Sequence, residues 1–146
     1  MTEQTQTLML EMMWAWSKKA SPALNPSVDP SQLWRFPNSE NHHAMGIVTT
    51  WGFCGVLKET EAYASRVFED DRTASQHYDE WTAYFKVYFC QRAGKGQSVE
   101  IASKSYNAHT IQMWYNLCDF SEDPSLRKMA GHYLDLYWAT WAEALN

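Results

Sequence analysis

Residues 121–141, SEDPSLRKMAGHYLDLYWATW, carry the clearest helix signal in the chain and decide its fold class. Asp123 is a good N-cap residue, and Pro124 suits the first helical position, where its missing N–H costs no hydrogen bond. Apolar residues then recur at helical spacing. They are Leu126, Met129, Ala130, Tyr133, Leu134, Tyr137, Trp138 and Trp141. The stretch therefore predicts a helix with one wide buried face.

Four further segments predict helices, and no segment has a convincing strand pattern. The ranges are 7–19, 39–57, a segment that opens at Thr73 and ends at RAGKG (92–96), and 105–120. The segment at 39–57 is apolar on nearly all sides, which is typical of a buried central helix. Its three glycines predict that another helix passes close by, because glycine in a helix costs about 1 kcal/mol relative to alanine. Thr73 and Gln76 form the pattern of a capping box.

Four prolines between Pro22 and Pro37 interrupt the helical pattern. Proline blocks helix formation and biases the preceding residue towards extended geometry. We therefore expect an irregular arm over residues 20–38, with Trp34 and Phe36 fixing its end to the core. The predicted fold is a single all-α domain over residues 1–146, with about five helices in antiparallel hairpins.

Composition narrows the classes of function. The chain has 146 residues and a net charge of −5, so it has no basic excess for binding nucleic acid. Three cysteines without metal-ligand spacing predict small buried side chains in a reducing compartment. No signal peptide and no apolar run of about 20 residues is present, so we expect a cytoplasmic protein without a membrane partner.

The first polar cluster, SENHH at residues 39–43, lies where the central helix is expected to begin. Free amides of a first helical turn favour anions, and Asn41 beside His42 could polarise a ligand while the imidazole takes a proton. Glu40 and His43 complete this candidate ligand-binding group. The alternative is that Ser39 caps the helix, Glu40 complements the helix dipole, and both histidines are partly exposed.

The second cluster, VEIASKSYNAHT at residues 99–110, precedes and opens another expected helix. Tyr106 and His109 are three residues apart on one helical face, so they could form an acid–base pair, with Glu100 and Ser103 binding a ligand. The alternative is that Ser103 or Ser105 is an N-cap residue, Tyr106 belongs to the core, and Glu100 accepts backbone amides at a turn.

Two side chains of the third predicted helix, His77 and Trp81, are counted among the candidate ligand-binding residues. The alternative for His77 is a hydrogen-bonded core histidine. Metal binding is not expected, because no paired histidines at four-residue spacing and no Asp-rich loop occur. No cofactor motif is present either.

Three segments in this order resemble a recurring part of α/α-toroid proteins, the helical-hairpin barrels of polysaccharide lyases and related glycoside-active enzymes. The segments are SENHHAM, HYDEWTAYF and VEIASKSYNAHTIQMWYNLCDFSEDPSLRKMA. The resemblance covers roughly residues 34–142. It implies that Asn41 and His42, together with Glu100, Ser103 and Tyr106, line a central cleft. About five helices would form only an arc of such a ring, and the arginine of many lyase sites has no evident match.

The sequence therefore predicts a small helical domain whose polar cleft binds a sugar-like or carboxylated small molecule. His42, Tyr106 and His109 are the candidate catalytic residues, and whether a reaction occurs stays open. One alternative is a non-enzymatic protein-interaction or dimerisation module, and another is an oligosaccharide lyase or hydrolase. An arc leaves apolar helix faces uncovered, so we also expect a homodimer unless the arm and the N-terminal helix cover them.

Overall fold

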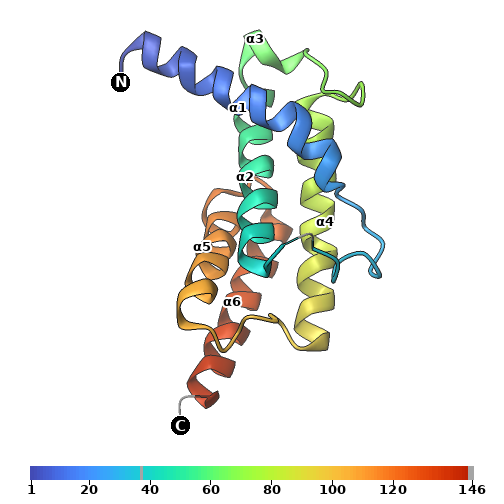
Figure 1. The fold of residues 1–146 in the computed structure, drawn as a ribbon, viewed down its shortest axis with the longest axis vertical. Helices are drawn as coiled ribbons and strands as arrows, with labels where there is room; N and C mark the ends of the chain where they lie inside the picture. Colours follow the sequence, from blue (N-terminus) through green and yellow to red (C-terminus); the bar gives the residue numbers. More distant parts are fainter. Residues whose placement is uncertain (37, 145–146) are drawn as a thin grey trace. The chain divides into compact units, whose positions relative to one another are not determined.

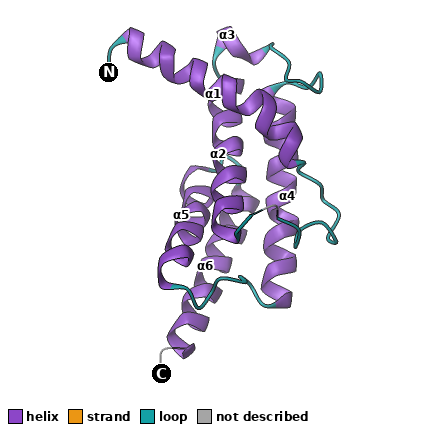
Figure 2. Cartoon of the chain, in the orientation of Figure 1, coloured by secondary structure: helices purple, strands orange, loops and turns teal. Residues whose placement is uncertain are grey.

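The computed structural model describes residues 1–36 and 38–144, which form six helices (Figures 1 and 2). The helices are α1 (Glu3–Leu24), α2 (Glu40–Lys58), α3 (Glu61–Ala64), α4 (Ala74–Lys95), α5 (Lys104–Phe120) and α6 (Pro124–Ala144). The only strand-like pairing among the described residues is an isolated bridge between Val67 and Thr73. The all-α prediction is confirmed. The short helix α3 was not expected from the sequence.

Helix α1 is longer than predicted and includes Pro22, so the irregular arm begins at Asn25 rather than at residue 20. Proline at this position leaves the carbonyl of Lys18 without its helical N–H partner. The backbone N–H of Glu69 donates to that carbonyl at 3.3 Å and replaces the missing bond. The helix continues through Pro22 because a residue distant in sequence satisfies the exposed carbonyl.

The predicted starts of the later helices agree closely with the structure. Thr73 and Gln76 form the predicted capping box, since the Thr73 N–H donates to the Gln76 side chain at 2.8 Å and the Gln76 N–H donates to Thr73 Oγ1 at 3.3 Å. Ser103 caps α5 by accepting from the Tyr106 N–H. Asp123 Oδ1 accepts from the Leu126 N–H at 2.8 Å at the start of α6. Local capping chemistry therefore fixes three helix starts.

The residues group into two compact units, and α2 and α4 each contribute to both. The first unit comprises Met1–Pro26 and Thr49–Trp81, and the second comprises Ser27–Val48 and the described residues from Thr82 onward. The prediction of a single domain is not decided by this grouping and stays a prediction.

The core of the first unit forms where α2 and α4 approach each other closely. A Cβ added to Gly55 would lie 3.1 Å from Cε2 of Tyr78, so this glycine permits the contact, as predicted. The same prediction is wrong for Gly52, because nothing lies within 4 Å of a Cβ added there. Trp51 stacks on the same tyrosine ring with centroids 5.5 Å apart.

The three cysteines differ in burial. Cys54 is buried, whereas Cys90 is exposed and Cys118 is half-buried. The expectation of three buried cysteines therefore holds only for Cys54.

The core of the second unit is an aromatic cluster from α4, α5 and α6. The ring of Phe89 lies 5.4 Å from Trp114 and 4.9 Å from Tyr133, measured between centroids. Helices α5 and α6 pack against each other and are joined by the short turn at 121–123. The ring-bearing side chains that recur at helical spacing along α4 are all buried, and those after Trp81 belong to this unit. They are His77, Trp81, Tyr84, Phe85, Tyr88 and Phe89.

Candidate functional site

The two polar clusters identified in the sequence meet in the second unit, where Glu40 and Glu100 bond reciprocally. The Glu100 N–H donates to Oε2 of Glu40 at 3.0 Å, and the Asn41 N–H donates to Oε2 of Glu100 at 3.0 Å. Glu100 thereby satisfies an amide that helix geometry leaves unpaired in the first turn of α2. Its carbonyl accepts from the N–H of Ser103, the N-cap of α5, at 2.8 Å. The first turns of α2 and α5 are therefore linked through Glu100.

Arg92 of α4 is fully buried and neutralises Glu40 beneath this link. Its Nη1 donates to Oε1 of Glu40 at 2.8 Å and to the Gln97 carbonyl at 3.2 Å, and its Nη2 donates to the Leu33 carbonyl at 3.2 Å. The Ser98 hydroxyl donates to the other oxygen of Glu40 at 2.5 Å. A buried charge needs partners of this kind, because an unpaired one costs several kcal/mol.

Aromatic rings enclose the same guanidinium. Its Cζ lies 3.9 Å from the ring centroid of Trp34, 5.0 Å from Tyr88 and 5.4 Å from Phe36. Arg92 Nε has no hydrogen-bond partner among the described residues, and the ring faces supply cation–π attraction there. Trp34 and Phe36 belong to the irregular arm, so Arg92 holds the arm to α4, as the sequence analysis expected of these two aromatic residues.

His43, one turn or less from Glu40 in α2, is half-buried and uncharged at neutral pH. Burial, and secondly the positive charge of Arg92, lower the pKa of His43 to about 4. Its Nε2 lies 3.5 Å from the Tyr84 hydroxyl, and its ring centroid lies 5.7 Å from that of Phe36. His43 therefore packs among arm and helix side chains, and its surroundings are those of a structural residue.

The other predicted site residues lie on the outside of the linked helix starts. His42 is exposed on the first turn of α2, and its Nδ1 lies 2.9 Å from the Ser39 hydroxyl. Tyr106 is 57% exposed on the first turn of α5, and His109 is exposed one turn later. Neither the Tyr106 hydroxyl nor the His109 ring has a hydrogen bond to another described residue. The expected core placement of Tyr106 under the alternative is therefore wrong, whereas Ser103, one of the two N-cap residues that this alternative offers, does cap the helix.

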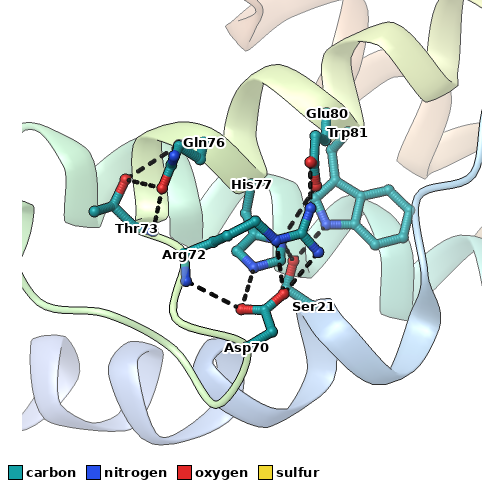
Figure 3. A network of polar contacts seen from close by, with 8 residues as sticks. All are labelled: Ser21, Asp70, Arg72, Thr73, Gln76, His77, Glu80 and Trp81. Atoms are coloured by element: carbon teal, nitrogen blue, oxygen red, sulfur yellow. Dashed lines mark hydrogen bonds and ion pairs between the residues drawn. The ribbon is translucent and has the colours of Figure 1, made fainter.

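His77 and Trp81 belong to a separate network in the first unit, shown in Figure 3. The Trp81 indole N–H donates to Ser21 Oγ at 2.8 Å, and Ser21 Oγ lies 2.7 Å from Nδ1 of His77. The other ring nitrogen of His77 lies 3.1 Å from Oδ1 of Asp70. Ser21, His77 and Trp81 are all fully buried, so the two predicted ligand residues of α4 cannot contact a ligand in this conformation.

Charged groups of the loop before α4 and of its second turn complete this network. Arg72 donates through Nε and Nη2 to Oδ2 of Asp70 at 2.8 and 2.6 Å, and through Nη1 to Glu80. Partial burial raises the pKa of Asp70, but hydrogen bonds from His77 and Arg72 and their charges outweigh it and leave that pKa below its ordinary value. Asp70 is therefore an ionised acceptor that fixes the His77 ring.

The order Ser21–His77–Asp70 is the order of groups in a hydrolytic triad. A nucleophilic serine must reach its substrate, however, and Ser21 is inaccessible while its oxygen accepts the indole N–H of Trp81. The groups instead join the end of α1 to α4 and to the loop before it. The interpretation of His77 as a hydrogen-bonded core histidine is the one that this geometry supports.

Arg92 and Ser98 are the important residues that sequence reasoning missed. Arg92 follows Trp81, Phe85 and Tyr88 at helical spacing on the buried stripe of α4. A charged residue in such a stripe predicts a buried counter-ion, and this signal could have identified Arg92. Its partner, Glu40, is distant in sequence and could not be found in the same way.

Three comparisons place these observations against known proteins. No family model, no curated protein and no solved structure matches the chain. The resemblance to α/α toroids therefore still depends on the sequence motifs alone. Among the described residues, no three His, Cys, Asp or Glu side chains are grouped as metal ligands would be. No helix in the described ranges is long and apolar enough to cross a bilayer.

Proposed function

We propose that the linked starts of α2 and α5 bind a sugar-like small molecule. The observation that supports this proposal is the reciprocal bonding of Glu40 and Glu100, which brings the two helix starts together. Glu40 and Glu100 are engaged in hydrogen bonds within the protein. The outer residues of the cluster, His42, Tyr106 and His109, remain accessible to a ligand.

The exposed groups fit hydroxyl-rich ligands better than carboxylates. An exposed tyrosine ring offers an apolar face and a polar hydroxyl, and imidazoles donate and accept hydrogen bonds. Arg92 pairs with Glu40 and, among the described residues, no cation pairs with Glu100, whose carboxylate lies beside the first turn of α2. A ligand carboxylate would be repelled by it, whereas sugar hydroxyls can donate to it.

The resemblance to toroid enzymes supports a saccharide and suggests helices stacked as antiparallel hairpins. For a lyase or hydrolase, Tyr106 or His109 would move the proton, and the general base must lie within hydrogen-bond reach of it. The triad-like Ser21 network is inaccessible, so it offers no nucleophile to a substrate. The proposal is therefore binding, with turnover as the further outcome to be assayed on the same saccharides.

Thermal unfolding of the full chain against neutral oligosaccharides and uronic acids tests the proposal. A ligand at ten times its dissociation constant adds about 1.4 kcal/mol to the free energy of unfolding, or roughly 3–5 °C in Tm. We expect neutral saccharides to raise Tm more than uronic acids do. His42→Ala and Tyr106→Ala should abolish the shift, whereas His132→Ala, an exposed histidine of α6, should retain it. No shift with any saccharide, or an equal loss in the control, would refute the proposal.

A second candidate function is a protein-interaction module. The specific observation in its favour is the exposure of large apolar side chains along α1, including Leu8 (54%), Met12 (73%) and Trp16 (48%). Such a surface is unusual for a chain that works alone.

A further inference from the structure

One face of α1 is mostly apolar and exposed. At 100° per residue the exposed Lys19 falls on this face as well, and the indole N–H of Trp16 donates to Thr50 Oγ1 of α2 at 3.1 Å. We define the α1 stripe as Leu8, Met9, Met12, Ala15 and Trp16, all of which are exposed. Met12 is the most exposed member at 73%, and the buried residues of α1, Ser17 and Ser21, lie on the opposite side. At 100° per residue the members of the stripe fall within about 120° of one another.

Two opposite charges lie on one edge of the α1 stripe. At 100° per residue, Glu11 and Lys18 fall on the same side of the stripe, two turns apart and separated by about 10.5 Å along the axis. That separation is too long for a salt bridge within the helix. Neither residue has an ion pair with another described residue. Both charges are therefore free to pair with charges of a partner that have the same spacing.

These features are complementary to the same helix running in the opposite direction. When two antiparallel helices are related by a two-fold axis across the contact, equivalent edges face each other with reversed direction. An axis between residues 14 and 15 then places Glu11 opposite Lys18 of the other copy, twice. It also brings Met12 to within one residue of the level of Trp16 of the other copy, and it places the two small Ala15 side chains next to the axis.

We propose that two copies of this chain pair through antiparallel α1 helices in this register. The charge pattern favours a second copy over other occupants, because it is self-complementary. An anionic membrane surface is disfavoured by Glu11 on the edge and by the net charge of −5. Methionine side chains suit such a contact, because they adapt to irregular surfaces.

One helix pair makes a small interface, so the association is weak. Stable dimers bury at least about 1,200 Å², and smaller contacts are typically weak or transient. We expect a dissociation constant of about 10–100 μM, which is a binding free energy of about 5.5–7 kcal/mol. The dimer therefore forms only at high protein concentration. Sedimentation equilibrium of the full chain from about 5 to 500 μM covers the transition.

The apolar part of the proposal is tested with Met12→Ser. We expect the dissociation constant to rise at least about tenfold, because Met12 contributes to the contact twice. Folding is not at risk, since the side chain is 73% exposed. Val28→Ser, which alters a 53% exposed valine of the arm, is the matched control and should leave the constant unchanged.

The register is tested by exchanging charges. Glu11→Lys and Lys18→Glu each create two like-charge contacts, and each should weaken pairing about tenfold. The double variant restores opposite charges and should return the constant to within about twofold of the original. Glu3→Lys, an exposed change on the opposite face of α1, controls for net charge. Circular dichroism of each variant verifies that the helix content is retained.

Three results would overturn the proposal. One is a chain that remains monomeric at about 500 μM, and another is a dimer that Met12→Ser leaves unchanged. The third is a double charge variant that fails to recover. Binding of monomeric chain to phosphatidylcholine vesicles through the α1 stripe would assign this surface to a lipid interface and would also reject the proposal.

Discussion

The buried pair of Arg92 and Glu40 supports the sharpest prediction about stability. Arg92→Met keeps much of the side-chain stem but removes the guanidinium, so Glu40 keeps only its bonds from Ser98 and Glu100. Removing one partner of a buried ion pair costs about 3–5 kcal/mol, because the other charge remains buried without compensation. This loss is a large part of the roughly 5–15 kcal/mol that is typical for a domain.

A double-mutant cycle separates the pair from other effects of the substitutions. Glu40→Gln should also destabilise the chain, because Arg92 then lacks its counter-ion. Arg92→Met with Glu40→Gln removes both charges, and the double variant should be at least about 2 kcal/mol more stable than the sum of the single effects predicts. Urea unfolding followed by tryptophan fluorescence measures all four free energies.

The control for this cycle is Arg35→Met, which alters an exposed arginine of the arm and should change stability by less than about 0.5 kcal/mol. The reasoning is refuted if Arg92→Met costs less than about 1 kcal/mol, or if the two single effects are additive. Either result would mean that the guanidinium and the carboxylate do not depend on each other in solution.

Three further predictions concern titration, reactivity and packing. Because the pKa of His43 is about 4 in the folded chain, against an ordinary value of 6.5 once the chain unfolds, the unfolded chain binds more protons between these values. Stability should fall by up to about 1.4 kcal/mol per pH unit as the pH drops from about 6.5 towards 4, and His43→Gln should flatten this dependence in urea titrations. Burial raises the pKa of Cys54 to about 12, so a thiol reagent should label exposed Cys90 first and Cys54 only on unfolding. Gly52→Ala should add up to about 1 kcal/mol in urea unfolding, since nothing lies within 4 Å of the added Cβ, whereas Gly55→Ala should not.

Part of the candidate site could be predicted from the sequence. The polar residues of both clusters were found by their position before helices, and the structure joins the clusters through Glu40 and Glu100. What could not be predicted is which residues face inward. Glu40 and Asn41 are buried, while their neighbour His42 is exposed, and this difference follows from where α4 places Arg92.

The sequence by itself determined the helical class and most helix starts, because helical periodicity and caps such as Asp123 act within a few residues of the chain. Only the tertiary structure decided the rest. It continues α1 through Pro22, because Glu69 supplies the bond that proline removes. It turns two suspected site residues, Glu40 and Glu100, into partners of each other. Contacts between distant residues depend on how the chain folds back, and local patterns do not carry that information.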